Sequence, residues 1–350
     1  MDGNGTAQLA SFRNDYSEGA HPRLLEALAR ASGEQNIGYG LDRHSLRAAE
    51  LIVARCGQPQ AKVHFLAGGT QTNLLAISAF LRPHEAVIAV NTGHVATHET
   101  GAIEATGHKV LVAPHVDGKL TPDGVRALLR ENTSEHMVKP RLVYVSNTTE
   151  LGTLYTRAEL QALRALCDAH GLLFFLDGAR LGSALAAAGD GLSLVDIAAL
   201  THAFYIGGTK NGALLGEALV VVEPTLQADL RYLIKQRGAM LAKGMVVGCQ
   251  FEALFEGALF VELGAHANAM AQRLQSGLKA AGVPMLIDSP SNQIFPVFAH
   301  AHIEALAHMT SFEHWAPYSD THAGIRFVTS WATRPESVDA LIHAVAGLVR

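Results

Sequence analysis

One lysine in this sequence lies among glycines, in a setting suited to covalent chemistry. Residues 205–212 read Tyr-Ile-Gly-Gly-Thr-Lys-Asn-Gly, and Lys210 stands between two apolar runs. Glycines allow a backbone to approach a bound group closely. Burial in such a loop lowers the pKa of a lysine and makes its amine a nucleophile. Taken alone, the segment is more typical of a surface turn with a solvated lysine.

A second segment upstream changes that balance. The apolar run 174–176 ends in Asp177-Gly178-Ala179-Arg180, and Asp177 lies 33 residues before Lys210. Together the two segments resemble the core of pyridoxal-phosphate enzymes with the aspartate-aminotransferase fold. The resemblance implies that Asp177 contacts the pyridine nitrogen and that Lys210 bonds covalently to the cofactor.

A glycine turn precedes a helical run at residues 67–81. An apolar strand at 63–66 leads into Gly68-Gly69-Thr70, and apolar residues at helical spacing follow from 74 to 81. Free N–H groups at a helix N-terminus attract anions, and Thr70 adds a hydroxyl. No lysine stands where a nucleotide-binding P-loop requires one, so a cofactor phosphate is the better ligand. An ordinary strand-to-helix turn is the alternative.

Histidines follow the next strand, expected at 86–90. His94 and His98 are four residues apart and Glu99 adjoins them, which on a helix makes a candidate metal pair. No third ligand is evident, so we expect no metal. An imidazole at a strand end can instead lie on a pyridine ring and move protons near neutral pH. His98 is then a supporting residue.

Strands and helices alternate along residues 60–222, which predicts a mainly parallel sheet with its site at the carboxyl ends of the strands. Five candidates each follow an apolar strand: Gly69, His94, Asn147, Asp177 and Lys210. Unrelated loops would seldom share that placement. It is the strongest argument that these residues meet.

The C-terminal part predicts a smaller α+β domain. We expect one long helix at 248–281, then strands at 285–288, 292–298 and 324–328, with domains at 1–250 and 251–350. Arg326 lies in the last strand between apolar residues, and its planar fork suits a carboxylate. The basic residues Arg231, Lys235, Arg237 and Lys243 form either a solvated helix face or an edge that reaches a phosphate in a neighbouring subunit.

Composition limits the remaining classes of function. The 350 residues are 49% hydrophobic with a net charge of −5, so a large core is expected and a nucleic-acid partner is not. We expect neither a signal peptide nor a membrane span. The three widely spaced cysteines, Cys56, Cys167 and Cys249, predict free thiols and a cytoplasmic location.

The ordered set of motifs resembles the L-threonine aldolases of the β-eliminating lyase group over nearly the whole chain. The signals are Phe-Arg-Asn-Asp at 12–15, Gly-Tyr-Gly at 38–40, Gly-Gly-Thr-Gln-Thr-Asn at 68–73, His94, Asp-Gly-Ala-Arg at 177–180, Thr-Lys at 209–210 and Arg326. The resemblance implies cleavage of L-threonine, L-allo-threonine and phenylserine to glycine and an aldehyde, in a homotetramer.

The resemblance also implies roles for single residues. His94 lies on the cofactor ring and acts on the substrate hydroxyl. Gly69 and Thr70 hold the phosphate, with help from Arg180 or from the Lys235 or Lys243 of a neighbouring subunit. The residues implied for the amino-acid substrate are Arg326, Asn14, Arg180 and Thr149.

Two departures from the family pattern bear on the substrate. Members carry Asn-Thr-His-Asn-Gly where this chain has Thr149 and Glu150, so the base that acts on the β-hydroxyl stays open. Asn14 stands where many relatives have serine. The alternatives are β-elimination or transamination on the same fold, a nucleotide-binding oxidoreductase, and a silent binding protein.

Overall fold

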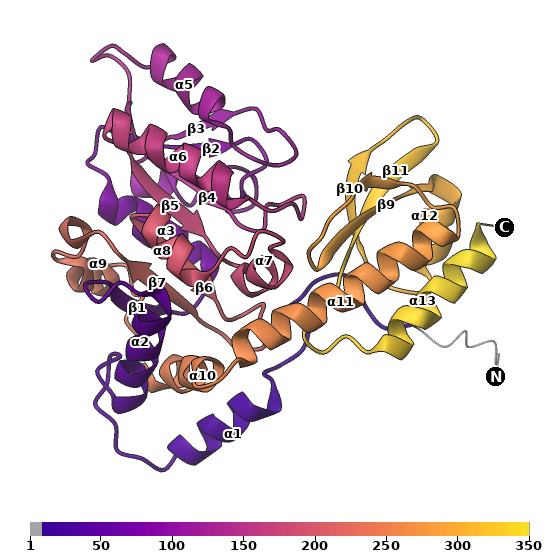
Figure 1. Cartoon of the computed structure of the whole chain (residues 1–350), viewed down its shortest axis with the longest axis horizontal. Helices are drawn as coiled ribbons and strands as arrows, with labels where there is room; N and C mark the ends of the chain where they lie inside the picture. The colour runs from indigo at the N-terminus through magenta and orange to yellow at the C-terminus, as the bar shows by residue number, and fades with distance from the viewer. Residues whose placement is uncertain (1–8, 350) are drawn as a thin grey trace.

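The computed structural model describes residues 9–349 and divides them into a larger and a smaller α/β part (Figure 1). The strands are β1 Lys62–Leu66, β2 Glu85–Val90, β3 Val110–Ala113, β4 Lys139–Ser146, β5 Leu173–Asp177, β6 Ala203–Gly207, β7 Glu217–Val221, β8 Met285–Ile287, β9 Gln293–Ala299, β10 Glu313–Pro317 and β11 His322–Val328. The α-helices are α1 Pro22–Ala31, α2 Arg43–Cys56, α3 Gly69–Phe80, α4 His94–Thr97, α5 Pro122–Glu131, α6 Arg157–His170, α7 Leu181–Ala187, α8 Leu194–Leu200, α9 Leu230–Gln236, α10 Met245–Phe255, α11 Leu259–Ala280, α12 His300–Ala307 and α13 Pro335–Leu348.

The larger part is built on a seven-stranded sheet with the order β1-β7-β6-β5-β4-β2-β3. Only β7 runs antiparallel to its neighbours, so the prediction of a mainly parallel sheet is confirmed. Every residue of β2, β5, β6 and β7 is buried. Continuous apolar strands of this kind need helices on both faces, and helices lie on both faces here.

The smaller part holds an antiparallel sheet with the order β10-β11-β9-β8. Together with the larger sheet it confirms the predicted fold class. Strand β10 was not expected, because its sequence, Glu-His-Trp-Ala-Pro, lacks alternation and its side chains are only half-buried. It pairs with β11 at the sheet edge, where a proline is tolerated.

The single helix expected at 248–281 was wrong, because residues 256–258 bend the chain between α10 and α11. Gly257 lies in the bend, and the rings of Phe255 and Phe260 stack across it with centroids 4.9 Å apart. Helix α10 packs on α1 and α2, whereas α11 packs on α7 and α13. One straight helix cannot satisfy both sets of contacts. We propose this bend as the domain boundary.

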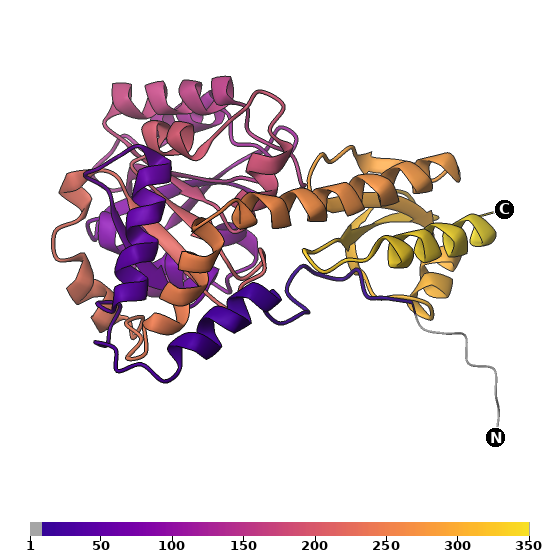
Figure 2. The same cartoon turned by 60° about the horizontal axis from the view of Figure 1, so that its bottom comes forward.

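The N-terminal segment joins the two parts (Figure 2). The N–H of Phe12 donates to Ser311 O at 2.9 Å, the N–H of Val328 donates to Phe12 O at 2.8 Å, and the Phe12 ring is buried in the smaller core. The chain then passes back to α1 on the larger part. Residues 13–20 therefore run between the parts and are placed to reach any site there.

The state of the cysteines agrees with the sequence. Cys56, Cys167 and Cys249 are free and buried. Within residues 9–349, no helix is long and apolar enough to cross a membrane.

The Asp-Gly-Ala-Arg motif has a steric reason for its glycine. A Cβ atom on Gly178 would lie 2.0 Å from the backbone oxygen of Tyr205, so only glycine allows β5 and β6 to approach so closely. We expect Gly178→Ala to lower the free energy of unfolding by ~1–3 kcal/mol or more, measured by urea titration. Gly189→Ala is the matched control, since nothing lies within 4 Å there. Equal stability of the two variants would contradict this explanation.

Candidate functional site

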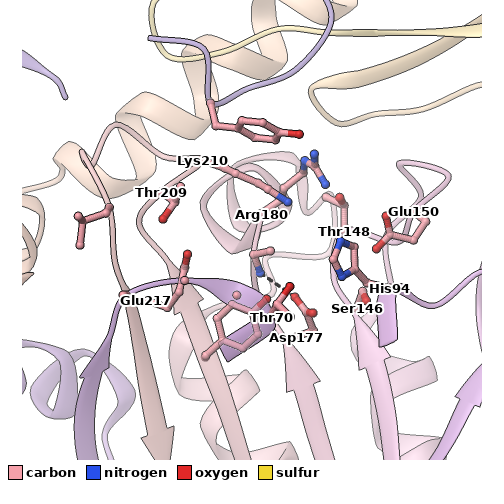
Figure 3. A pocket seen from close by; sticks show the side chains of 17 residues that line it. Thr70, His94, Ser146, Thr148, Glu150, Asp177, Arg180, Thr209, Lys210 and Glu217 are labelled. Atoms are coloured by element: carbon pink, nitrogen blue, oxygen red, sulfur yellow. Dashed lines mark hydrogen bonds between the residues drawn. The ribbon is translucent and has the colours of Figure 1, made fainter. Parts of the chain in front are cut away.

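A cavity of ≈310 Å³ opens at the carboxyl ends of the central strands (Figure 3). Six of the residues singled out from the sequence line it: Gly69, Thr70, His94, Asp177, Arg180 and Lys210. They come from separate segments, and the strand ends bring them together. The cavity therefore lies where the sequence predicts the site, at the carboxyl ends of the parallel strands.

Lys210 lies in the loop that follows β6, and its amine faces this cavity (Figure 3). The neighbouring Thr209 holds the loop, because its Oγ1 accepts from the N–H of Gly216 at 3.1 Å. Burial, and then the charge of Arg180, lower the pKa of Lys210, while Asp15, Glu150 and Asp177 partly offset them. A buried amine with a lowered pKa is suited to nucleophilic attack.

Asp177 is a buried carboxylate at the end of β5. Its Oδ2 accepts from Asn73 Nδ2 at 3.0 Å and from the Tyr144 hydroxyl, and its Oδ1 accepts from the N–H of Ala179 at 2.9 Å. Burial alone would raise its pKa, but His94 and these donors outweigh burial, so the pKa of Asp177 is lowered. The group is therefore an anion at neutral pH and can pair with a cationic ring nitrogen.

His94 is fixed by a buried glutamate. Its Nδ1 lies 2.7 Å from Glu99 Oε1, and Asn73 Nδ2 also donates to that oxygen at 2.7 Å. Burial opposes the charged imidazole, but Glu99 and then Glu150 and Asp177 raise the pKa of His94. The His98 ring centroid lies 5.7 Å away. Among residues 9–349 no group of three or more potential metal ligands occurs.

The start of α3 provides an anion site at the opposite end of the cavity. Gly68 is its N-cap residue, and no side chain caps the helix. The first N–H groups of a helix have no partner within it, so they are available to a ligand beside Gly69 and Thr70. This arrangement suits a phosphate.

Arg180 is held by a buried ion pair. Its Nε and Nη2 donate to the two oxygens of Asp15 at 2.7 and 3.1 Å. Asn292 Nδ2 also donates to Asp15, at 2.9 Å. Asp15 thus joins the N-terminal segment, the larger part and the smaller part beside the cavity.

Arg326 lines an adjoining outer cavity of ≈460 Å³, together with His94, Glu150, Arg180 and Lys210. Its Nη1 donates to Gln293 Oε1 at 3.3 Å, and its guanidinium lies 4.9 Å from the Trp315 ring centroid. Among residues 9–349, the buried Nε finds no hydrogen-bond partner. Burial, and then Arg180, lower the pKa of Arg326. A buried guanidinium with unused donors suits a carboxylate ligand.

Neither cavity is lined by four of the residues expected at the site, which are Asn14, Asn147, Thr149 and Lys243. Thr149 turns to Thr153, with 2.7 Å between the two hydroxyl oxygens, and its neighbours Thr148 and Glu150 line the cavity instead. Asn14 Oδ1 accepts from the N–H of Tyr16 at 3.0 Å. Lys243 is exposed after α9.

The basic residues of α9, Arg231 and Lys235, also do not line either cavity within one chain. Lys235 lies over the Tyr39 ring, 4.7 Å from its centroid. A contribution of Lys235 or Lys243 to the cavity of a neighbouring subunit stays a prediction.

Sequence reasoning missed several residues of the site. Glu217 and Tyr16 line the cavity, and Asn73 and Glu99 form the polar network beneath it. A charge at the start of the otherwise apolar segment 217–222 was the available signal for Glu217. Asn73 is the last residue of the motif at 68–73, and no local pattern marks it as a partner of Asp177.

Comparisons with known proteins agree with this geometry. The family model described as beta-eliminating lyase matches residues 12–302. A low specificity L-threonine aldolase of Pseudomonas sp. is 32% identical over 96% of this chain and 97% of its own length. A threonine aldolase structure from Leishmania major is 50% identical, with a TM-score of 0.96 over 97% of this chain and 100% of that one. An aspartate aminotransferase of Thermus thermophilus, 19% identical with a TM-score of 0.73, shares the fold.

The donors in the cavity fit the cofactor on which this family depends. Pyridoxal 5′-phosphate needs an amine, an anion for its ring nitrogen and a phosphate site, and Lys210, Asp177 and the start of α3 are the corresponding groups. The protein is thus a pyridoxal-phosphate enzyme, and its chain belongs to the β-eliminating lyase family.

Proposed function

We propose that this enzyme is a low-specificity aldolase that cleaves β-hydroxy-α-amino acids between Cα and Cβ. Its substrates are L-threonine, L-allo-threonine and phenylserine, and its products are glycine and the matching aldehyde. One observation carries the proposal: the Lys210 amine, the Arg326 guanidinium and the His94 imidazole line one outer cavity. Relatives named as threonine aldolases support the choice of reaction.

The cofactor supplies an electron sink for the carbanion left at Cα when Cα–Cβ breaks. Lys210 would hold the cofactor covalently through its amine. Asp177 would keep the ring nitrogen protonated, because its own pKa is lowered. Gly69 and Thr70 would hold the phosphate, and His94 would contact the ring.

Arg326 binds the substrate carboxylate through its unused donors, with Arg180 as the second cation of the outer cavity. A carboxylate fixed at one end restricts rotation about the bond from nitrogen to Cα. Arg326 would thereby orient the Cα–Cβ bond for cleavage. Positioning of this kind lowers the entropic cost of reaching the transition state.

Proton transfer at the β-hydroxyl is assigned to His94. Its Nδ1 is held by Glu99, so Nε2 is the nitrogen that exchanges protons with the substrate. Glu150 also lines both cavities and is the alternative base. Thr149 is no longer a candidate for direct contact, because its hydroxyl lies against Thr153.

β-Elimination and transamination are not favoured, since the relatives are named as aldolases. A nucleotide-binding oxidoreductase does not fit the family. A binding protein without catalytic activity would leave the buried amine of Lys210 and the buried carboxylate of Asp177 without a role. We further propose a homotetramer located in the cytoplasm. The exposed apolar residues Ile37, Tyr39, Leu41 and Leu46 support an interface, and the buried free thiols support a reducing compartment.

The enzyme with its cofactor should convert L-threonine to glycine and acetaldehyde without forming a 2-oxo acid and ammonia. Borohydride reduction followed by peptide mapping should place the cofactor on Lys210. We expect Lys210→Ala to lose both the label and the reaction, whereas Lys279→Ala, at an exposed ion pair with Asp288, should retain both. A label on Lys235 or Lys243 would overturn the assignment.

Steady-state kinetics on the three substrates tests Arg326. A hydrogen bond to a charged group contributes ~1.5–3 kcal/mol, so Arg326→Ala should lower kcat/KM by roughly 10- to 150-fold on every substrate. Arg326→Lys should restore only part of this, because lysine lacks the bidentate fork. Arg273→Ala, at an exposed ion pair with Asp339, is the control. A loss confined to one substrate would show that Arg326 contacts the side chain instead.

A further inference from the structure

Glu217 lines the cavity but has no part in the bond cleavage described above. It is the first residue of β7 and pairs in register with Leu66, the last residue of β1. The chain passes from Leu66 through Gly68 into α3, so Glu217 lies at the phosphate end of the cavity (Figure 3). Its side chain is buried, and the residue is only 4% exposed.

Neutral donors surround this carboxyl group. Oε2 accepts from the N–H of Gly208 at 3.1 Å, and the Thr209 hydroxyl is a second hydrogen-bond partner. Within residues 9–349, no lysine, arginine or histidine nitrogen lies within ion-pair distance of Glu217. An ionised carboxylate buried in this way lacks a compensating charge.

The groups that face Glu217 from the packed elements explain its protonation. Lys210 follows β6, Asp177 ends β5, and the first turn of α3 has no acidic residue. Tyr205 of β6 has a pKa raised well above its usual value by burial first, so it is a neutral phenol. Burial raises the pKa of Glu217 to about 8, with Asp177 adding to the rise and Thr209, Lys210 and Gly208 opposing it.

In alkaline solution, where Glu217 is ionised, a phosphate at Gly69 and Thr70 adds a second anion to this end of the cavity. Two anions that share a buried site repel each other, so one of them must take up a proton. The ester phosphate is a dianion above pH ~7, since its second pKa is about 6. Glu217 is therefore the group that changes its charge, and a neutral carboxyl can donate a hydrogen bond where a carboxylate cannot.

We propose that Glu217 is a wall of the phosphate site that works as a neutral carboxylic acid, so that in alkaline solution, where the free site holds a carboxylate, binding of the cofactor phosphate takes up one proton from solvent at Glu217. The inference rests on the proposed placement of the phosphate beside Gly69 and Thr70. No covalent bond changes in this step. The affinity for the cofactor consequently falls as the pH rises, because binding requires a proton at Glu217 and the concentration of protons in solution decreases.

Titration calorimetry of the cofactor-free protein with pyridoxine 5′-phosphate tests the proposal. This probe has the phosphate but no aldehyde, so it cannot bond to Lys210. Buffers with different ionisation enthalpies give the number of protons taken up. Lys210 and the ring nitrogen also exchange protons, so the quantity compared is the difference between wild type and Glu217→Gln at pH 9.

Wild type should take up about one proton more than Glu217→Gln. Between pH 8.5 and 9.5 its affinity for pyridoxine 5′-phosphate should therefore fall by an additional factor of roughly ten relative to the affinity of Glu217→Gln. Glu50→Gln, at an exposed ion pair with Arg47, should retain the wild-type uptake. Pyridoxine, which lacks the phosphate, should show no difference between wild type and Glu217→Gln. Equal uptake in wild type and Glu217→Gln overturns the proposal.

Two further measurements separate the outcomes. If Thr70→Val weakens pyridoxine 5′-phosphate binding while Glu217→Gln takes up protons like wild type, only the role of Glu217 fails. If Thr70→Val binds as wild type does, the phosphate placement itself fails. Infrared difference spectra of wild type need no variant, and phosphate binding at pH 9 should produce the C=O band of a protonated carboxyl. Absence of that band contradicts the proposal even if Glu217→Gln does not fold.

Discussion

The site depends on keeping the buried Asp177 carboxylate ionised. An isolated buried carboxylate would take up a proton, and a neutral Asp177 could not hold a cationic ring nitrogen. Asn73, the Tyr144 hydroxyl and the backbone of Ala179 supply the compensating donors. Asn73 also contacts Glu99, which fixes His94, so one amide connects the carboxylate assigned to the ring nitrogen with the imidazole assigned to the ring face.

A second buried carboxylate ties the two parts of the molecule to this site. Asp15 receives Arg180 from the larger part and Asn292 from the smaller part, while belonging to the N-terminal segment itself. Removing one partner of such a buried pair typically costs ~3–5 kcal/mol, because a charge is left without compensation. The outer cavity has Arg326 on one part and Lys210 on the other. Asp15 joins these two parts through its ion pair with Arg180 and its hydrogen bond from Asn292.

The sequence was informative wherever an apolar strand ended in a polar residue. The carboxyl ends of parallel strands meet at one edge, which is why Asp177, His94 and Lys210 could be placed together from one chain. Thr149 could not be judged in this way. Successive side chains of a loop point in different directions, and the hydrogen bond with Thr153 that turns Thr149 away depends on the tertiary path of residues 147–153.

Long-range polar contacts were the other limit. Asp15 and Asn292 lie 277 residues apart in the chain, and no local pattern marks them as partners. The bend between α10 and α11 was missed for a related reason. An apolar helical pattern runs across Gly257, and a single glycine is tolerated within a helix unless packing on different neighbours favours a break.

The most direct test of the central claim is nitrogen NMR of the enzyme loaded with pyridoxal phosphate that carries ¹⁵N in its ring. An ionised Asp177 should hold the ring nitrogen protonated, so the pyridinium chemical shift should persist from about pH 6 to about pH 9, beyond the range in which the free cofactor stays protonated. A chemical shift typical of the neutral nitrogen at pH 7 would contradict the account.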